Sequence, residues 1–411
     1  MVKDLLVKLF EKRDRNYVMA TQVLGALLAL ITGKLIALYV SPEDFGTYGI
    51  QFATFTFFST ILVSPLLQFF KTSNTSLLSD IGIKPFASTL IISLAGAYIL
   101  MMAFFNWYYD NKLGILYLLL FLHLISNSLN SILGDQLNTR NKLIDFSNLS
   151  ILKACLSLFF LVIFFAFDLD FLDHVSALWA MHIIGGIAGL ALFFGKYEYY
   201  KGRFHIGYGS FIKKYVQFGW PLAISALLVW ISNYFDRYAI EYFLDTEAVG
   251  IYSASYGVGS KFFLVLSPLF LIMLTPQVYS QNNRDFKKKE INRYAFLYAL
   301  IATPILIGIY FLKEIIGTLL LSESYQEGFY LIFWVAFAFF IFTLTKLYEL
   351  YFYSESLTRV ILVGNAVAAF LNILFNFLLI PTYGIFGAGI STLISFGSYF
   401  IVMYCWITYY S

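Results

Sequence analysis

Charged side chains are scarce in this sequence. Only 12% of its 411 residues are Asp, Glu, Lys or Arg, while 60% are hydrophobic and 20% are aromatic. Soluble domains carry about 25% charged residues, because side chains that face water must be largely polar. The mean hydropathy is +0.76. This composition excludes an ordinary soluble domain and predicts a chain whose natural solvent is lipid.

Cysteine and histidine are rare as well. The two cysteines, Cys155 and Cys405, lie inside apolar runs, which argues against a disulfide framework or a zinc site. The four histidines show no metal-ligand spacing, so we expect neither a metal nor another cofactor. The net charge of +3 is small and scattered, which argues against a nucleic-acid partner.

Long apolar runs fill most of the chain. A membrane-spanning helix needs about 20 mostly apolar residues. By that rule twelve spans are predicted, at residues 17–40, 47–70, 86–105, 113–133, 150–167, 175–195, 215–235, 249–278, 294–312, 329–351, 360–380 and 384–404. Residues 1–16 are charged and predict a short amphipathic surface helix rather than a cleavable signal peptide. The fold class is therefore an all-α membrane protein.

The connections between the spans alternate in charge. Basic residues collect at the N-terminus and after the fourth, sixth and eighth spans, where the connection after the fourth carries Arg140, Lys142 and Lys153. Acidic residues collect in the other connections, such as the one with Glu241, Asp245 and Glu247. Basic loops stay in the cytoplasm, so both termini are predicted to be cytoplasmic. No connection is long enough for a catalytic domain, which favours a transporter over an enzyme.

A short motif occurs twice. Residues 43–48 and residues 247–252 both follow the pattern E-x-x-G-x-Y, and a Ser-Pro pair follows each at Pro65 and Pro268. Chance could produce one such match, but matched features in register favour an internal repeat. We therefore predict two pseudo-symmetric six-helix lobes, at residues 17–200 and 201–411, related by an axis along the membrane normal.

A few charged residues fall within the apolar spans. At 1.5 Å per residue, Lys34 lies about 25 Å along the first span and Lys261 about 18 Å into the eighth. Such cations persist in membranes when they face a watery cavity or a partner. Lys34, Lys71, Arg237 and Lys261 are candidates for binding an anionic headgroup in a cavity between the lobes. Lys71 could instead be a cytoplasmic anchor, Lys34 could reach the interface, and Arg237 could do so or pair with Asp236.

Other polar residues give weaker signals. Asn365, Asn372 and Asn376 recur along the eleventh span and are typical of contacts that hold helices together. Lys346 and Glu349 lie three residues apart near one end of the tenth span, which favours an ion pair.

Three stretches resemble a known family. They are residues 45–48, residues 233–238 followed by 248–253, and residues 371–376 followed by 380–388. Their motifs resemble those of Wzx-type polysaccharide flippases, members of the MATE/MOP superfamily, to which MATE multidrug exporters and lipid II flippases also belong. The resemblance runs along the whole chain in order. Two departures are that Lys71 stands where many relatives carry arginine, and that the two extra helices of lipid II flippases are absent.

This resemblance implies a substrate. It would be an undecaprenyl-diphosphate-linked oligosaccharide, the repeat unit of O-antigen, capsule or exopolysaccharide, moved across the bacterial inner membrane by alternating access. Lys34, Lys71, Arg237 and Lys261 would then bind the diphosphate. Asp236 would serve coupling to H+ or Na+, or a charge pair. Other polysaccharide assembly proteins could be partners, besides the lipid bilayer itself.

Two other functions stay open. A MATE-like cation-coupled multidrug exporter would need carboxylates at depth, and Asp236 is the main candidate. A membrane oligosaccharide polymerase or glycosyltransferase usually carries a long outer loop with catalytic residues, which this sequence lacks.

Overall fold

The computed structural model describes residues 13–73, 83–109, 114–167, 169, 171–194, 208–280 and 282–409. Helices account for nearly all of them, and no β-strand occurs in these ranges. Most of the predicted N-terminal surface helix, 1–16, lies outside the described residues. An all-helical chain is the physical expectation in lipid, where each backbone N–H must find an acceptor within its own segment.

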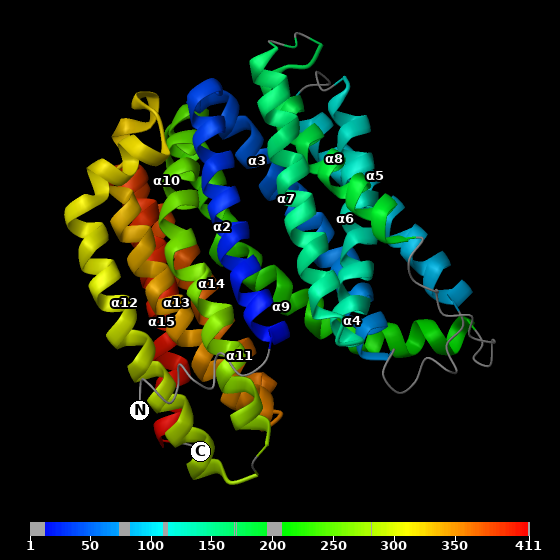
Figure 1. Ribbon diagram of the computed structural model, residues 1–411, viewed down its shortest axis with the longest axis vertical. Coiled ribbons are helices and arrows are strands. Elements are labelled where there is room, and N and C mark those ends of the chain that lie inside the picture. The colour runs from blue at the N-terminus through cyan, green and yellow to red at the C-terminus, as the bar shows by residue number, and fades with distance from the viewer. Residues whose placement is uncertain are drawn as a thin grey trace. The chain divides into compact units, whose positions relative to one another are not determined.

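The helices are labelled in Figure 1. Their bounds are α2 Arg13–Tyr39, α3 Pro42–Phe58, η1 Ser59–Val63, α4 Ser64–Ser73, α5 Ile83–Tyr109, α6 Leu116–Thr139, α7 Leu143–Ala166, α8 His174–Phe194, α9 Tyr208–Phe243, α10 Thr246–Leu264, α11 Leu266–Tyr279, α12 Arg284–Leu320, η2 Glu323–Gly328, α13 Leu331–Ser354, α14 Thr358–Tyr383 and α15 Ile385–Tyr409.

Twelve helical segments of the described chain are long and apolar enough to cross a membrane, which confirms the predicted number. Several begin earlier than the apolar runs do. Helix α12 begins at Arg284, although the run was predicted from residue 294, and α7 begins at Leu143. The apolar pattern detects the part of a helix that suits lipid, whereas the backbone hydrogen bonds continue into charged turns. Lys153 therefore lies within α7 and not in a connection, contrary to the prediction.

The chain divides into two compact units. Unit 1 comprises Met1–Leu28 and Gln51–Leu227, and unit 2 comprises Ala29–Ile50 and Leu228–Ser411. In unit 1, α8 packs against α6 and α7 (Figure 1). In unit 2, α13 packs against α10, α12 and α15, and α14 packs against α15. Relative to the predicted lobes, residues 29–50 join the second half of the chain, so Lys34 lies in the same unit as Arg237 and Lys261.

The Ser-Pro pair of the repeat interrupts a helix in each half. Before Pro65 the chain forms one π-helical turn, η1, between α3 and α4. Before Pro268, α10 ends at Leu264 and α11 begins at Leu266. Proline lacks an N–H and its ring crowds the carbonyl four residues earlier, so a helix adjusts or breaks there. The regular α-helix of both spans is therefore interrupted at matching positions of the repeat.

The two glycines of the repeat contact the opposite copy. Gly46 and Gly250 each occupy the fifth position of their helix, α3 and α10. A methyl group on Gly46 would lie 1.9 Å from the Thr246 carbonyl oxygen, and one on Gly250 would lie 1.8 Å from the Pro42 carbonyl oxygen. The two contacts are reciprocal, because in each of them the first residue of one helix lies against the fifth residue of the other. Only glycine allows backbones to approach this closely.

Candidate functional site

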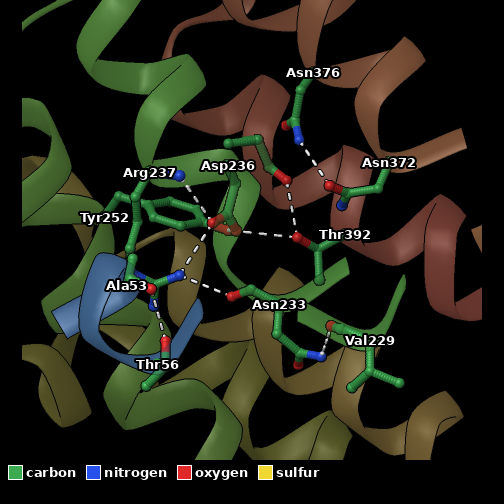
Figure 2. A network of polar contacts seen from close by, with 11 residues as sticks. Ala53, Thr56, Val229, Asn233, Asp236, Arg237, Tyr252, Asn372, Asn376 and Thr392 are labelled. Carbon is green, nitrogen blue, oxygen red and sulfur yellow. Dashed lines mark hydrogen bonds and ion pairs between the residues drawn. The ribbon is translucent and has the colours of Figure 1, made fainter. Parts of the chain in front are cut away.

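Asp236 and Arg237 form an ion pair inside unit 2. The guanidinium Nη1 of Arg237 donates to Asp236 Oδ1 at 3.0 Å and to the Asn233 carbonyl at 2.8 Å, as Figure 2 shows. Asp236 is 1% exposed and Arg237 is 8% exposed. A buried charge needs a partner because burial removes its hydration. Among the alternatives considered for Arg237, the structure shows the ion pair with Asp236.

Aromatic side chains complete the surroundings of this pair. The hydroxyl of Tyr252, on α10, donates to Asp236 Oδ2 at 2.5 Å and lies 3.4 Å from Thr392 Oγ1 on α15 (Figure 2). The Arg237 guanidinium carbon lies 5.0 Å from the ring centre of Tyr234 and 5.2 Å from that of Tyr256. These ring faces attract a cation at such distances. Side chains of α9 and α10 thus contact the pair directly, Thr392 of α15 contacts Tyr252, and both charges have partners.

Two asparagines of the eleventh span lie near this network. Asn376 Nδ2 donates to Asn372 Oδ1 at 3.0 Å, and both side chains are fully buried in α14 (Figure 2). Their remaining amide atoms, Asn372 Nδ2 and Asn376 Oδ1, have no hydrogen-bond partner within the described residues. A buried amide atom without a partner is costly. Amide and hydroxyl oxygens beside a carboxylate are also the donor atoms that a small cation prefers.

Lys34 contacts the end of another helix. Its ammonium donates to the Thr318 carbonyl at 3.1 Å and to the Leu321 carbonyl, where α12 terminates. The last carbonyls of a helix lack intrahelical partners and carry partial negative charge, so a cation stabilises them. Nearby, the Ser322 hydroxyl donates to the Ala37 carbonyl at 2.5 Å. Lys34 therefore helps to attach the end of α12 to α2.

Lys261 reaches the same helix, α2, from α10. Its ammonium donates to the Ala29 carbonyl at 2.9 Å. A Cβ on Gly33 would lie 3.6 Å from that ammonium, so the glycine leaves room for it. The Lys261 ammonium thus lies along the turn of α2 that immediately precedes Lys34. Neither lysine has an ion pair with a carboxylate within the part of the chain that the structure describes.

Lys71 lies in the other unit and has a different partner. It is in the last turn of α4, and its ammonium pairs with Asp135 Oδ1 of α6 at 2.7 Å. The charge of Lys71 is therefore balanced, whereas the contacts of Lys34 and Lys261 with other described residues are hydrogen bonds to backbone carbonyls. The structure brings Lys34, Arg237 and Lys261 into unit 2 with Asp236, and places Lys71 in unit 1.

Two partners of the candidate residues do not follow from the sequence. Asp135 and Tyr252 both contact candidate site residues, yet Asp135 lies near the end of a span and Tyr252 is one of 31 tyrosines. The repeat motif that contains Tyr252 was the one available signal. The predicted pair of Lys346 and Glu349 is confirmed at 2.8 Å, and the Tyr399 hydroxyl also donates to that carboxylate.

Metal-binding groups of the usual composition do not occur among the described residues, where no three His, Cys, Asp or Glu side chains could hold an ion together. What the site offers chemically is fixed positive charge at membrane depth together with one buried ion pair. Fixed positive charge of this kind attracts anions.

Comparison with solved structures places this fold among known ones. The chain is similar to lipid II flippase MurJ in an inward closed conformation, with a TM-score of 0.72 and 15% identity over 95% of this chain and 87% of that one. It is also similar to an inward-facing multidrug resistance MATE family transporter of the MOP superfamily, with a TM-score of 0.66, 11% identity, and coverage of 97% and 98%. A third similar structure is the Vibrio cholerae MATE transporter VcmN in its bent form, with a TM-score of 0.58, 14% identity, and coverage of 99% and 98%.

The twelve candidate spans and this likeness define a multi-pass membrane protein with a fold like that of lipid II flippase MurJ and MATE transporters. A search of curated protein sequences found no match. The family model described as "Polysaccharide biosynthesis protein" matches residues 35–330, well over half of the chain. The chain belongs to this polysaccharide biosynthesis protein family, and the resemblance to Wzx-type flippases is confirmed.

Proposed function

We propose that the protein is a flippase for undecaprenyl-diphosphate-linked oligosaccharides, the repeat units of O-antigen, capsule or exopolysaccharide. It would carry them by alternating access across the bacterial cytoplasmic membrane, with both of its own termini in the cytoplasm. The family match and the MATE/MOP-like fold support transport in polysaccharide synthesis. The cargo itself rests on the charges in the spans.

One observation carries the proposal. Lys34 of α2 donates to carbonyls at the end of α12, and Lys261 donates to the Ala29 carbonyl of α2. Among the described residues, neither lysine pairs with a carboxylate. Two cations without carboxylate partners attract a polyanion, and a dehydrated diphosphate needs charge-assisted donors of this kind. Arg237 and Lys71 are already balanced by Asp236 and Asp135, so they would contribute less net charge. Lys34 and Lys261 are accordingly our first candidates for the diphosphate site.

Transport of this cargo would make or break no bond. The diphosphate would bind to the lysines, the sugars to polar side chains, and the isoprenoid tail would remain in lipid. The membrane potential is worth about 2.3 kcal/mol per charge per 100 mV, which is substantial for a dianionic headgroup. In this scheme the bilayer is the solvent of the protein, and the electrical potential across it supplies energy for transport. Other polysaccharide assembly proteins would supply and receive the cargo.

A coupling ion, H+ or Na+, is proposed at Asp236. The carboxylate lies in the same network as Thr392, and Asn376 Oδ1 is a buried oxygen without a partner in the described residues. An added cation would compete with Arg237 for the carboxylate, because the ion pair occupies Asp236 Oδ1. Binding of the ion would thus loosen Arg237, which links the ion to a charged residue of the site.

A cell-based experiment tests the cargo. The gene is deleted, and the leaflet distribution of lipid-linked oligosaccharide is measured with a membrane-impermeant enzyme that acts on the sugars. We expect the oligosaccharide to accumulate in the inner leaflet, because its carrier is missing. If no accumulation occurs, the proposed function is wrong.

Rescue of that deletion tests the site. Lys261→Met should fail to restore the outer-leaflet pool, whereas Lys289→Met should restore it, because Lys289 is exposed and outside the candidate site. Full rescue by Lys261→Met would remove Lys261 from the site while leaving the function intact.

A MATE-like multidrug exporter is the second candidate. It would need a carboxylate free to bind a cationic drug. Of the buried carboxylates among the described residues, Asp236 pairs with Arg237, Glu290 with Arg293 and Glu349 with Lys346. The fold likeness alone favours this alternative, so drug sensitivity of the deletion strain is measured in parallel. Increased sensitivity without stranded oligosaccharide would favour the exporter.

A further inference from the structure

A polar pocket lies within unit 1, away from the residues proposed for the diphosphate. Its volume is ≈ 320 Å³. It is formed by α4, α6 and α7, and its lining residues are Ser64, Leu67, Gln68, Asn130, Ser131, Gly134, Asp135, Phe146, Leu149, Ser150 and Lys153. Seven of these eleven side chains are polar or charged, although the helices are apolar spans. The volume is that of a small-molecule site, but the lining is more polar than the mainly apolar walls of most such sites, which favours a polar ligand.

Asn130 is the most buried polar residue of this pocket, at 4% exposure. Its Nδ2 donates to the Gly186 carbonyl at 3.0 Å and to the Ser126 carbonyl at 2.8 Å, which fixes the orientation of the amide. Its Oδ1 has no hydrogen-bond partner in the described residues. Burying an acceptor without a donor is unfavourable, and a hydrogen bond donated by a ligand that reached this oxygen would remove that cost.

Lys153 provides the charge of the pocket. It lies about 15 Å along α7 from Leu143, at the usual rise per residue. It has no ion pair and no hydrogen bond within the described residues. The other charges at the pocket are Asp135 and its partner Lys71, which balance each other at 2.7 Å. The pocket therefore carries about one net positive charge, located on Lys153.

The remaining lining groups offer acceptors and one apolar face. The Ser131 and Ser150 hydroxyls donate to backbone carbonyls, at 2.9 Å and 3.1 Å, which leaves their oxygen lone pairs for a ligand. Phe146 and Leu149 supply carbon surface beside them. A fitting ligand would donate several hydrogen bonds, carry a negative charge and present a C–H face. A sugar bearing a carboxylate meets all three requirements, whereas a simple anion meets only the second.

We propose that this pocket binds an acidic sugar residue, with its carboxylate on Lys153, a hydroxyl on Asn130 Oδ1 and its ring against Phe146. This assignment rests on the proposed function in so far as the sugar belongs to the transported oligosaccharide. It places sugar recognition in unit 1 and diphosphate binding in unit 2.

Three small probes test the pocket without any transport measurement. Methyl β-glucuronide, methyl β-glucoside and acetate are added to the purified protein in phosphatidylcholine nanodiscs, and binding is followed by saturation-transfer NMR. The glucuronide combines charge and hydroxyls, the glucoside has only hydroxyls, and acetate has only charge. We expect the glucuronide to bind at least tenfold more tightly than either of the other two.

Substitutions locate the binding. A charge-assisted hydrogen bond contributes enough that its loss weakens binding by about tenfold or more. Lys153→Met should weaken glucuronide binding by this factor, Lys153→Arg should retain most of it, and Lys289→Met should have no effect. Because Lys153 makes no hydrogen bond in the described chain, these variants should fold, which the elution profile on size exclusion checks.

Each other result overturns the assignment. Equal binding of acetate and glucuronide would make Lys153 a simple surface cation. Unchanged binding in Lys153→Met would place the sugar elsewhere. Loss of glucuronide binding when phosphatidylglycerol is added to the nanodiscs would assign the pocket to a lipid headgroup. All three outcomes leave the proposed function standing, because its own test is the stranded oligosaccharide in cells.

Discussion

The buried pair of Asp236 and Arg237 allows a quantitative prediction. Asp236→Ala removes the carboxylate that pairs with the Arg237 guanidinium, which is 8% exposed and also donates to the Asn233 carbonyl. Removing one partner of a buried ion pair costs about 3–5 kcal/mol, since the remaining charge stays buried without compensation. The Tyr252 hydroxyl also loses its acceptor, at 2.5 Å. We expect the free energy of unfolding to fall by about this amount.

The double variant separates the charge effect from packing. Asp236→Leu combined with Arg237→Met replaces both charges by apolar side chains of similar size. Replacing a whole buried pair in this way is often neutral or stabilising by about 1–4 kcal/mol. The double variant should therefore be more stable than Asp236→Ala alone, although it carries one more substitution. Arg237→Met alone should be destabilised, because Asp236 is then unpaired.

The assay is unfolding of the purified protein in mixed micelles, with SDS as the denaturant and far-ultraviolet circular dichroism as the signal. A double-mutant cycle of wild type, Asp236→Leu, Arg237→Met and the double variant gives the interaction energy of the pair. If the effects of the two single substitutions simply add in the double variant, the two charges do not stabilise each other. That result would refute the reasoning about Arg237 and Asp236.

Two more predictions use the same unfolding assay. Gly250→Ala places a methyl group 1.8 Å from the Pro42 carbonyl oxygen and should cost about 1–3 kcal/mol, whereas Gly257→Ala, with nothing within 4 Å, should be neutral or slightly stabilising. If Gly250→Ala and Gly257→Ala lowered the free energy of unfolding by the same amount, the close contact of Gly250 with the Pro42 carbonyl would be contradicted. Hydrogen bonding from Lys287, at 2.6 Å, lowers the pKa of Glu355 below its ordinary value of 4.5. The folded state therefore gains stability above pH 4.5 and loses it as the pH falls through the lowered pKa, so Glu355→Gln should show a smaller loss of midpoint on acidification than the wild type.

The sequence predicts the fold well because lipid imposes a simple rule on composition. Each span needs a long apolar run, and twelve such runs were visible. The sequence predicts the ends of the helices less well. The charged first turns of α12, from Arg284, and the position of Lys153 within α7 depend on backbone hydrogen bonds that continue after the apolar pattern has ended.

The candidate site was only partly predictable. Depth in a span singled out Lys34 and Lys261, because a cation in hydrocarbon needs a reason to be there. Their partners did not follow from the sequence. The Ala29 and Thr318 carbonyls belong to the backbone and carry no residue-specific pattern, and each is more than 200 positions away along the chain. Such contacts exist only after the helices have packed.

The repeat motif lies between these two cases. It identified Gly46 and Gly250 as equivalent positions, and the structure places them in reciprocal contact with the helix starts of the opposite copy. The pattern alone did not show that the two copies touch. Equivalence is a property of the sequence, whereas contact depends on how α3 and α10 cross.

Translocation in a purified system tests the central claim most directly. Protein is reconstituted into vesicles that contain undecaprenyl-diphosphate-linked oligosaccharide, and the fraction accessible to an added enzyme is followed with time. Wild type and Lys261→Arg should both move the lipid, because each keeps a cation beside the Ala29 carbonyl, while Lys261→Met should be at least tenfold slower. Equal rates for Lys261→Met and wild type would contradict the account, since the oligosaccharide would then cross without the cation.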